Sequence, residues 1–457
     1  MQKHGLGTSG PRICALSFDC KEQELPNLSI PLCCLKNRPR RLVSTENGMV
    51  ETARSMSTSS EIVIIGGGPA GLAAATILGR KGVRVIVLDR QSLPADKVCG
   101  EGIMPPGVSI LSEIGALPLI SSEDAHPFAG ISYRTTRGAQ AKADFESGPG
   151  RGIRRTALSR ALRTLSSALP SVTLEEGVRV TGVRRTSGGM VVSSSQRPPI
   201  TCRLVIGADG LRSRVRRWAG LEGRPPQRSR FGVRQHFHVA PWSRYVEIYC
   251  GPSLEAYVTP CGPTNVGVAI LWEPSRCPQA RPGEELFASL LASLPELQER
   301  LAGAQAANAP RSTGPFEQRT RHRTSEGLCL LGDASGYLDP CTGEGLTLAF
   351  KQAHALGNCL PEALGQFRKG SVPRSALLPY ESDWRRITRS YFLCTRFMLA
   401  CQRHPGTFDR LLNFAAGRPD VLRHFTSYNM GTAPLLPAPR RMARWLFQTD
   451  IANAENS

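Results

Sequence analysis

The segment EIVIIGGGPAGLAAATILGRKGVRVIVLDR, residues 61–90, predicts a strand, a glycine turn, a helix and a second strand. Residues 62–65 are apolar and β-branched, as a parallel strand buried on both faces requires. We expect the helix over Leu72 to Arg80, with a stop at Lys81-Gly82, and the second strand over Val83 to Leu88. This order of elements indicates an α/β fold.

The glycines of this turn have the spacing G-x-G-x-x-G of a dinucleotide-binding turn. Gly66 permits a tight turn, Gly68 lets the backbone approach a pyrophosphate, and Gly71 lets the helix pack closely on the strand. The start of the helix offers free N–H groups to an anion, and Asp89 is placed to accept hydrogen bonds from ribose hydroxyls. An ordinary α/β turn is the alternative. The predicted site also includes the neighbouring residues Pro69, Ala70 and Arg90.

The composition indicates a globular enzyme with a sizeable core, because the chain has 457 residues and 40% of them are hydrophobic. The formal charge of +20 comes mainly from arginine, yet no basic stripe is interleaved with aromatic residues, so we expect no nucleic acid partner. The 14 cysteines form no C-x-x-C pair, and no apolar run approaches about 18 residues. We expect a cytoplasmic protein with reduced thiols and no obligate protein partner, and leave peripheral membrane contact open.

Residues 1–60 mix Cys, Pro, Ser and Arg without a period and contain no apolar signal stretch. Acidic residues such as Glu22 and Glu46 argue against a transit peptide. We therefore expect a disordered N-terminal extension, and favour a nonfunctional extension over a targeting device.

Two further segments of the chain resemble parts of the same α/β domain. The buried strand Cys202 to Ile206 ends in Gly207-Ala208-Asp209-Gly210, and a strand over Gly327 to Leu331 runs into Gly332-Asp333. A second glycine turn, Gly343 to Gly345, precedes an apolar helix. Because no long-period repeat is visible, these segments predict one discontinuous nucleotide-binding domain.

Between these segments the pattern changes to alternating strand-like runs from Phe231 to Ala269, separated by Pro and Gly, which indicates an antiparallel sheet facing the substrate. The predicted division is a disordered extension at 1–60, the nucleotide-binding domain in parts 61–130, 151–222 and 325–360, the substrate sheet with a helix in 131–150 and 223–324, and a helical C-terminal region at 361–457.

Three motifs in this order, GGGPAG, GADGLRSRVR and GDASGYLDPCTGEG, resemble the FAD-dependent monooxygenases and oxidoreductases of the p-hydroxybenzoate hydroxylase fold. The resemblance covers roughly residues 61–360 and implies a Rossmann-like FAD-binding domain of the glutathione-reductase (GR2) type. It implies that Asp209 with Gly210 lies near the pyrophosphate and the nicotinamide approach, and that Asp333, after Gly332, binds the ribityl chain.

The same resemblance adds other cofactor residues. It places Arg155 near the FAD phosphates, although an exposed, salt-bridging arginine is the alternative. Backbone N–H groups of Gly343, Glu344 and Gly345, at a helix start, are able to stabilise negative charge at the flavin N1–C2 edge. Val180 is the last of the predicted FAD-binding residues.

No catalytic residue is assigned, but three candidates stand out. The loop Lys97 to Gly102, KVCGEG, resembles the geranylgeranyl-reductase-like branch, and its Cys99 either tunes the flavin or is an inert packed thiol. Tyr257 occupies the place where members of the family that the chain resembles have an aromatic-Pro segment over the flavin. His236 and His238 share a strand face, yet no third ligand is apparent, so we expect no metal and either a structural or a pocket role.

These observations favour an NAD(P)H-dependent flavin monooxygenase that hydroxylates a small hydrophobic or aromatic molecule, such as a secondary metabolite or a quinone-like compound. The Cys-Gly loop suggests an alternative, a reductase that saturates isoprenoid double bonds. A non-catalytic flavin electron carrier is the alternative of another class.

Overall fold

The computed structural model describes residues 59–226, 230–276, 281 and 283–447. All of them belong to one compact unit, Ser55–Ser457. The extension predicted over residues 1–60 lies outside the described residues, except for its last two, which begin the first strand.

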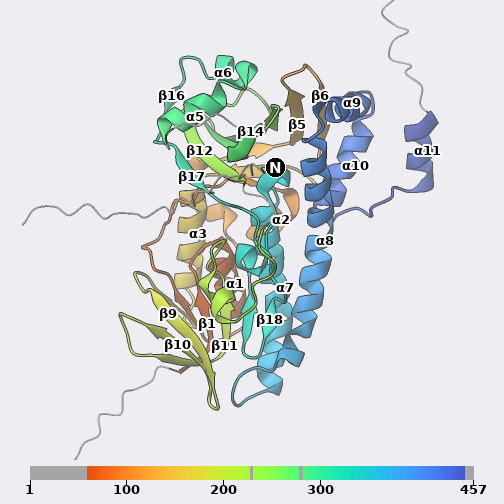
Figure 1. Ribbon diagram of the computed structural model, residues 1–457. Coiled ribbons are helices and arrows are strands. Elements are labelled where there is room, and N and C mark those ends of the chain that lie inside the picture. The colour runs from red at the N-terminus through yellow and green to blue at the C-terminus, as the bar shows by residue number, and fades with distance from the viewer. Residues whose placement is uncertain (1–58, 227–229, 277–280, 282, 448–457) are drawn as a thin grey trace, which may run out of the picture. The chain divides into compact units, whose positions relative to one another are not determined.

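The central sheet has a parallel core in the order β19-β11-β1-β2-β8 (Figure 1). Ile65 lies opposite both Leu88 and Gly207, and Gly207 lies opposite Leu330, so these strands end at one common edge. Both glycine turns follow this edge, where α/β sheets bind ligands. The strands are β1 Ser59–Ile65, β2 Val85–Leu88, β8 Val172–Glu175, β11 Ile200–Gly207 and β19 Leu328–Leu330.

Three short antiparallel strands extend this sheet. The hairpin of β9 Val180–Thr186 and β10 Gly189–Ser194 pairs with the first half of β11, and β18 Thr324–Ser325 pairs with β19. The central sheet is therefore mixed, with antiparallel strands added to a parallel core.

Both faces of the central sheet are covered, as the apolar run of β1 predicts. Ile62 and Ile64 pack under the helices α1 Pro69–Arg80, α3 Arg155–Ser167 and α7 Gly345–Gln366. Val63 and Ile65 face the opposite side, together with the β9–β10 hairpin and α4 Arg214–Trp218. The predicted end of the first helix at Lys81 is confirmed.

The second sheet has the order β16-β12-β15-β14-β13-β5-β6, with β17 also on β12. Its pairs are antiparallel except β5–β13, which is parallel, and this differs from the uniformly antiparallel sheet we expected. The physical reason is connectivity: β5 arrives from an early segment of the chain, so no hairpin forces its direction. The strands are β5 Gly130–Thr135, β6 Gln140–Asp144, β12 Phe231–His238, β13 Tyr245–Cys250, β14 Leu254–Gly262, β15 Asn265–Trp272, β16 Gln305–Ala306 and β17 Arg311–Thr313.

One face of the second sheet is covered by α5 Glu284–Leu291 and α6 Pro295–Arg300, seen beside it in Figure 1. A third sheet has three strands, β3 Gly102–Ile103, β7 Gly150–Ile153 and β4 Ala125–Phe128, and contacts β14 of the second sheet. The helix α2 Pro105–Glu113 follows β3 and packs on α7.

The C-terminal region is helical, as expected. The long helix α8 Leu378–Cys401 packs along α7, and α9 Pro405–Ala416, α10 Pro419–Asn429 and α11 Pro439–Phe447 follow it (Figure 1). Tyr391 and Met398 of α8 are buried, whereas Leu393 and Phe397 are exposed. Among the described residues, no helix is both long and apolar enough to cross a membrane.

Candidate functional site

A cavity of about 540 Å³ lies between the common edge of the central sheet and one face of the second sheet. This volume is within the usual range of a binding site for a cofactor or small molecule. Most of the predicted site residues line it: Gly68, Pro69, Ala70, Arg90, Cys99, Arg155, Asp209, Gly210, Tyr257, Gly332, Asp333, Gly343 and Gly345.

Other predicted residues do not line this cavity, and two of them support the turn from behind. Gly66 has φ +115°, and a Cβ there would lie 2.4 Å from the carbonyl oxygen of Ala208. A Cβ on Gly71 would lie 2.0 Å from the carbonyl oxygen of Gly66. Both glycines therefore permit close backbone packing, while Gly68 faces the cavity.

Asp89 is also absent from the cavity wall, because its carboxylate already holds the turn. One oxygen accepts a hydrogen bond from Gly67 N at 2.6 Å, and the other accepts from Gln91 N at 2.8 Å. The ribose contact expected for Asp89 stays a prediction.

Val180 and Glu344 lie beneath the surface of the site. Val180 begins β9 and packs in the core of the hairpin side. Glu344 is buried before α7, and its carboxyl accepts from Asn429 Nδ2 at 3.2 Å. Burial raises the pKa of Glu344 to about 8, although the Coulomb attraction of Lys351 opposes the rise.

One end of the cavity is suited to phosphate. The Nη1 atom of Arg155 is buried without a hydrogen-bond partner, and the side of Gly68 that a Cβ would fill is open apart from Lys97 Nζ at 3.9 Å. Burial lowers the pKa of both cations, and in Lys97 the nearby Arg155 lowers it further. A pyrophosphate would satisfy the orphaned guanidinium and relieve the repulsion between these two cations.

Two carboxylates mark the middle of the cavity. One oxygen of Asp209 accepts from Arg214 N at 2.7 Å and Val215 N at 3.1 Å at the start of α4, and its other oxygen is buried without a partner. Asp333 is the second residue of a 3-10 turn, Gly332–Ser335. Burial raises the pKa of Asp333, opposed by the positive charges of Lys97 and Arg155.

The other end of the cavity is apolar. Cys99 lines the same cavity and is half-buried; burial raises the pKa of its thiol against the opposing charge of Arg155, so the thiol keeps its proton at neutral pH. Tyr257 is buried and donates its hydroxyl to the carbonyl oxygen of Cys341 at 2.6 Å. The wall beside Tyr257 comes mainly from the second sheet: Ile131, Val246, Ile248, Ala269 and Leu271.

His236 does not line the cavity. It is completely buried and bonds Glu101, whereas His238 is exposed at the end of β12, so the two histidines do not act as a pair. The sequence showed no third ligand, but the fold brings Glu101 and Cys261 to His236, with one ligand atom of each within 4.8 Å of the others. Residues remote in sequence therefore form this cluster.

Several lining residues were not predicted. Lys97 and Glu101 stand inside the loop KVCGEG, so the quoted motif contained them. Phe316 and Tyr337 also line the cavity, but nothing in their local sequence distinguishes them from core aromatics.

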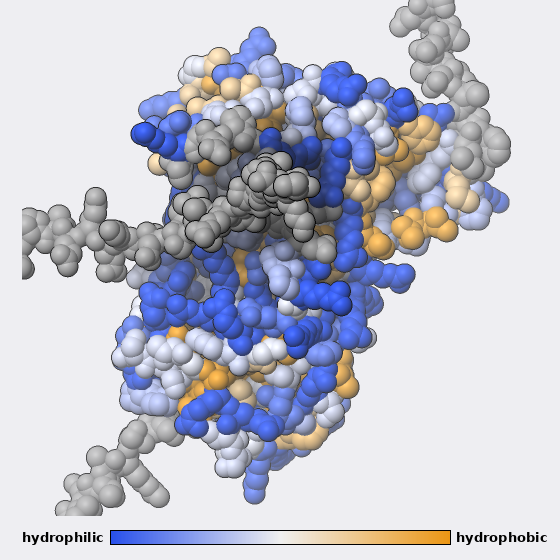
Figure 2. Space-filling view, viewed as in Figure 1, coloured by the Kyte–Doolittle hydropathy of each residue, from blue (hydrophilic) through white to orange (hydrophobic). Residues whose placement is uncertain are grey.

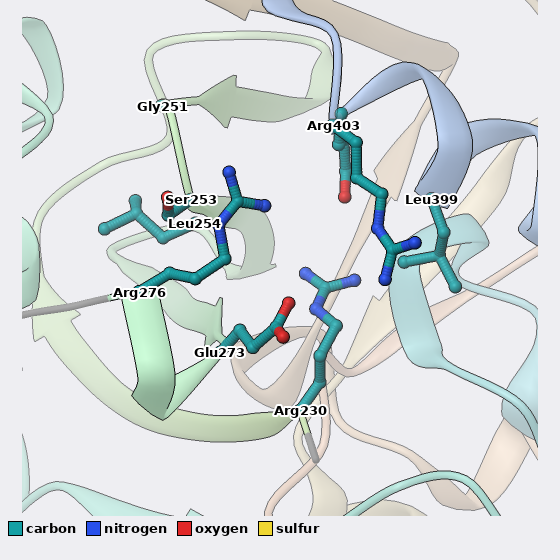
Figure 3. Close-up of a pocket in the computed structure, with 9 residues that line it drawn as sticks. Arg230, Gly251, Ser253, Leu254, Glu273, Arg276, Leu399 and Arg403 are labelled. Atoms are coloured by element: carbon teal, nitrogen blue, oxygen red, sulfur yellow. The ribbon is translucent and has the colours of Figure 1, made fainter. Parts of the chain in front are cut away.

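A second, smaller pocket of about 30 Å³ lies elsewhere, where Arg230, Arg276 and Arg403 converge with Glu273 (Figure 3). Arg230 is already paired with Glu255 at 2.8 Å and Asp339 at 2.9 Å. The pocket has room for water but not for a substrate.

The glycine turn, the unpaired guanidinium and the apolar chamber together define a dinucleotide-binding oxidoreductase. The chain belongs to the FAD binding domain family, whose profile matches residues 59–392. Its fold is the α/β fold of the flavoprotein monooxygenases, and the predicted recognition is confirmed.

Known proteins resemble this chain over most of its length. It is 30% identical to digeranylgeranylglycerophospholipid reductase 1 of Methanococcoides burtonii, covering 72% of this chain and 80% of that protein. It is 27% identical to squalene monooxygenase of Rattus norvegicus, covering 69% and 58%. A flavoprotein/dehydrogenase from Cytophaga hutchinsonii has the same fold, with a TM-score of 0.71 at 20% identity, covering 82% of this chain and 93% of that one.

The protein is therefore an FAD-dependent oxidoreductase with a geranylgeranyl-reductase-like sequence. The described residues fit FAD, because the open side of Gly68 and the orphaned Arg155 Nη1 suit its pyrophosphate. FAD, when bound, supplies hydride or activated oxygen chemistry, and the chain supplies binding, exclusion of water and proton transfer.

Proposed function

We propose that the protein saturates a carbon–carbon double bond of a long apolar substrate of the isoprenoid type, using FAD. The observation that carries this is the apolar chamber of the cavity, which adjoins the loop holding Cys99. The similarity to a digeranylgeranylglycerophospholipid reductase supports it, and changes the order of preference that the sequence suggested, in which a monooxygenase came first.

Saturation of a double bond adds a hydride to one carbon and a proton to the other. Cys99 is the proposed proton donor, because its thiol lines the cavity and burial raises its pKa, which keeps the S–H intact at neutral pH. Tyr257 is less suited, since its hydroxyl proton is already donated to Cys341 O. Its proposed role is to shape the chamber.

Hydroxylation of a small hydrophobic or aromatic substrate is the second candidate, supported by the similarity to squalene monooxygenase. It would use the same chamber to exclude water. In either reaction we propose NADPH or NADH as the electron donor, binding transiently, since the described residues contain no second glycine-rich turn of the G-x-G-x-x-G type.

The decisive experiment is turnover without oxygen. FAD-loaded protein, NADPH and a digeranylgeranyl glycerophospholipid are incubated anaerobically, with squalene in a parallel sample, and products are measured by mass spectrometry. We expect the lipid product to gain two hydrogen atoms per double bond. Product that forms only in air and carries isotopically labelled oxygen would overturn the reductase, and flavin reduction without any product would favour an electron carrier.

Cys99→Ala tests the proton donor. We expect kcat to fall about 100-fold, as is usual for loss of a general acid, while KM changes little. Cys359→Ala is the matched control, because Cys359 is also half-buried but lies on α7 outside the cavity wall. Equal activity of both variants would exclude Cys99 as the donor.

The C-terminal helices carry a surface suited to an anionic membrane, which would give access to a lipid substrate. Figure 2 shows apolar side chains gathered on this side of the molecule, next to α11. Ring and hydrogen-bond contacts connect its parts: Phe397 to Phe425, His424 to Trp445, and Arg418 to Trp445 O. The exposed apolar residues are Leu393, Phe397, Leu411, Phe414, Leu435, Leu436 and Met442.

The charge of the C-terminal helices also favours contact with an anionic membrane. Residues 378–447 contain eleven arginines, no lysine and four carboxylates, so this region is strongly basic. Exposed apolar side chains beside arginines favour an anionic bilayer surface over a neutral one. The proposed contact is peripheral.

Vesicle co-sedimentation tests this contact. We expect binding to phosphatidylserine vesicles and about tenfold weaker binding to phosphatidylcholine vesicles. The double substitution Leu435→Asp with Leu436→Asp should abolish binding, whereas Leu119→Asp, at an exposed leucine outside this surface, should not. Identical sedimentation of all three proteins would remove the proposal.

A further inference from the structure

Glu101 has an unusual backbone conformation and a buried side chain. Among the described residues it is the non-glycine residue with a left-handed backbone, at φ 61°, although its side chain is buried. Its carboxylate accepts from Arg155 N at 2.7 Å, from His236 Nε2 at 2.6 Å and from the Cys261 thiol at 3.2 Å. A left-handed backbone at a non-glycine residue and a buried carboxylate both cost free energy. Such a residue persists only where surrounding contacts stabilise it.

The hydrogen bonds around His236 fix its tautomer. Asn308 Oδ1 accepts from His236 N at 3.2 Å, which turns Asn308 Nδ2 toward His236 Nδ1 at 2.8 Å. Arg234 Nη1 lies 2.6 Å from the same Nδ1 atom and is farther from Nε2 of the ring. Both neighbours are donors, so Nδ1 accepts and the proton is on Nε2, directed at Glu101.

A metal ion is the competing explanation for a cluster of Glu101, His236 and Cys261. The guanidinium of Arg234 contacts the imidazole and pairs with Asp96 at 2.6 Å, so a positive charge already stands beside the cluster. It would repel a divalent cation. Hydrogen bonds from His236 and Arg155 N, with the charge of Arg234, oppose the effect of burial and lower the pKa of Glu101, so the anion needs no metal.

Glu101 connects two groups of the cavity wall. Its own N–H donates to Cys99 Sγ at 3.3 Å, while its carbonyl oxygen accepts from Ile153 N at 3.0 Å. Its carboxylate accepts the N–H of Arg155, the first residue of α3, whose Nη1 atom is orphaned at the phosphate end. One residue thus contacts both groups: its backbone N–H donates to the thiol of Cys99, and its carboxylate holds the backbone of Arg155.

We propose that Glu101 and His236 form a positioning pair, which sets the thiol of Cys99 and the guanidinium of Arg155 in the cavity. His236 acts through Glu101 and does not touch the substrate. This inference rests on the proposed function only in giving Cys99 a reaction to serve; the placement of the thiol is measurable without a substrate.

The test is the pH profile of Cys99 alkylation by iodoacetamide in FAD-loaded protein, measured by mass spectrometry at that residue. The Glu101 N–H lowers the pKa of the Cys99 thiol against the larger effect of burial. We expect His236→Ala to release this bond and move the alkylation midpoint upward by about one pH unit. His236→Gln keeps an N–H donor at the Nε2 position and should restore the native midpoint.

A second variant separates backbone strain from the side-chain tether. Glu101→Gly permits the left-handed φ without the carboxylate. It should raise the Cys99 midpoint like His236→Ala and weaken FAD binding about fivefold through Arg155. His238→Ala, an exposed histidine on the same strand, is the matched control and should change neither quantity.

The outcomes separate this inference from the reaction itself. A native midpoint in both His236→Ala and Glu101→Gly overturns the positioning pair, as does a shift in Glu101→Gly alone. Failure of double-bond saturation, with the shifts intact and reversed in His236→Gln, overturns the proposed function and leaves the pair standing.

Discussion

The two glycine turns at the cavity differ in what confines them. In the first turn Gly66 and Gly71 face backbone: a Cβ would lie 2.0 Å from Gly66 O at Gly71 and 2.4 Å from Ala208 O at Gly66. In the late turn they face side chains, with Met104 Cε 2.8 Å from a Cβ on Gly343 and Tyr337 Oη 3.2 Å from one on Gly345. Backbone cannot move aside, whereas a methionine or tyrosine end can, so the first turn is the rigid part of the site.

Gly71→Val should have the largest effect, because its side chain would overlap the backbone of the first turn. We expect loss of more than about 3 kcal/mol of stability and little folded protein, measured by thermal melting and soluble yield. Gly182→Val is the control, since no atom lies within 4 Å of a Cβ there. A folded, stable Gly71→Val protein would contradict the rigidity of this turn.

Gly68→Val should separate folding from cofactor binding. A Cβ at this position meets Lys97 Nζ at 3.9 Å, so the apoprotein has room to fold, but the side chain would obstruct the pyrophosphate. We expect an unchanged melting temperature without FAD and affinity for FAD reduced by about 100-fold, measured by dialysis and flavin absorbance. A full yellow complement would remove Gly68 from the site.

Asp333→Ala tests the segment that follows β19, before the late turn. Loss of the hydrogen bond that we expect Asp333 to make to the ribityl chain should weaken FAD binding by about tenfold, with the fold intact. Asp333→Asn keeps an oxygen acceptor and should lose less. Equal affinity of the alanine variant and the native protein would place the ribityl contact elsewhere.

Glu344→Gln tests a pH dependence of the late turn. The pKa of Glu344 is raised to about 8, so the folded protein holds this proton more tightly than the unfolded chain. Stability from this group is therefore present below the ordinary value of 4.5 and is lost as pH rises toward 8. The variant should gain roughly 2–4 kcal/mol at pH 8 relative to pH 4.5, by urea denaturation.

The control for this prediction is Glu362→Gln, an exposed glutamate on the same helix. Its stability difference from the native protein should stay the same at both pH values. An equal gain in both variants would show that Glu344 is not the titrating group.

Gly345→Ala should have the smallest effect. Its methyl group requires only a slight shift of the Tyr337 hydroxyl, and alanine favours the start of α7. We expect FAD affinity within about threefold of native and stability within about 1 kcal/mol. A loss above tenfold would mean that the late turn is as rigid as the first.

The first turn was predictable because its signals are local. The run at residues 62–65, the glycine spacing and the stop at Lys81 lie within 30 residues of sequence, and the structure forms the strand and helix as expected. The three motifs also predicted that distant segments share one sheet, and β1, β11 and β19 are adjacent in it.

The parts that escaped prediction depend on contacts between remote residues. Glu101 and His236 meet across 135 positions, and neither neighbourhood reveals the other. The parallel β5–β13 pair depends on where an early segment joins the sheet edge, which local alternation does not encode. Asp89 follows β2 at the predicted place, but the hydrogen bonds that its carboxylate accepts from Gly67 N and Gln91 N follow from tertiary geometry.

The order of β19 beside β11 has a consequence for synthesis on the ribosome. The first turn emerges early, but the strand that completes the parallel core begins at Leu328 and the late turn ends at Gly345. Until then the nascent chain exposes the edge of β11 and has half a cofactor site. FAD is therefore expected to join the protein after about three quarters of the chain has been made, once β19 is available to cover that edge.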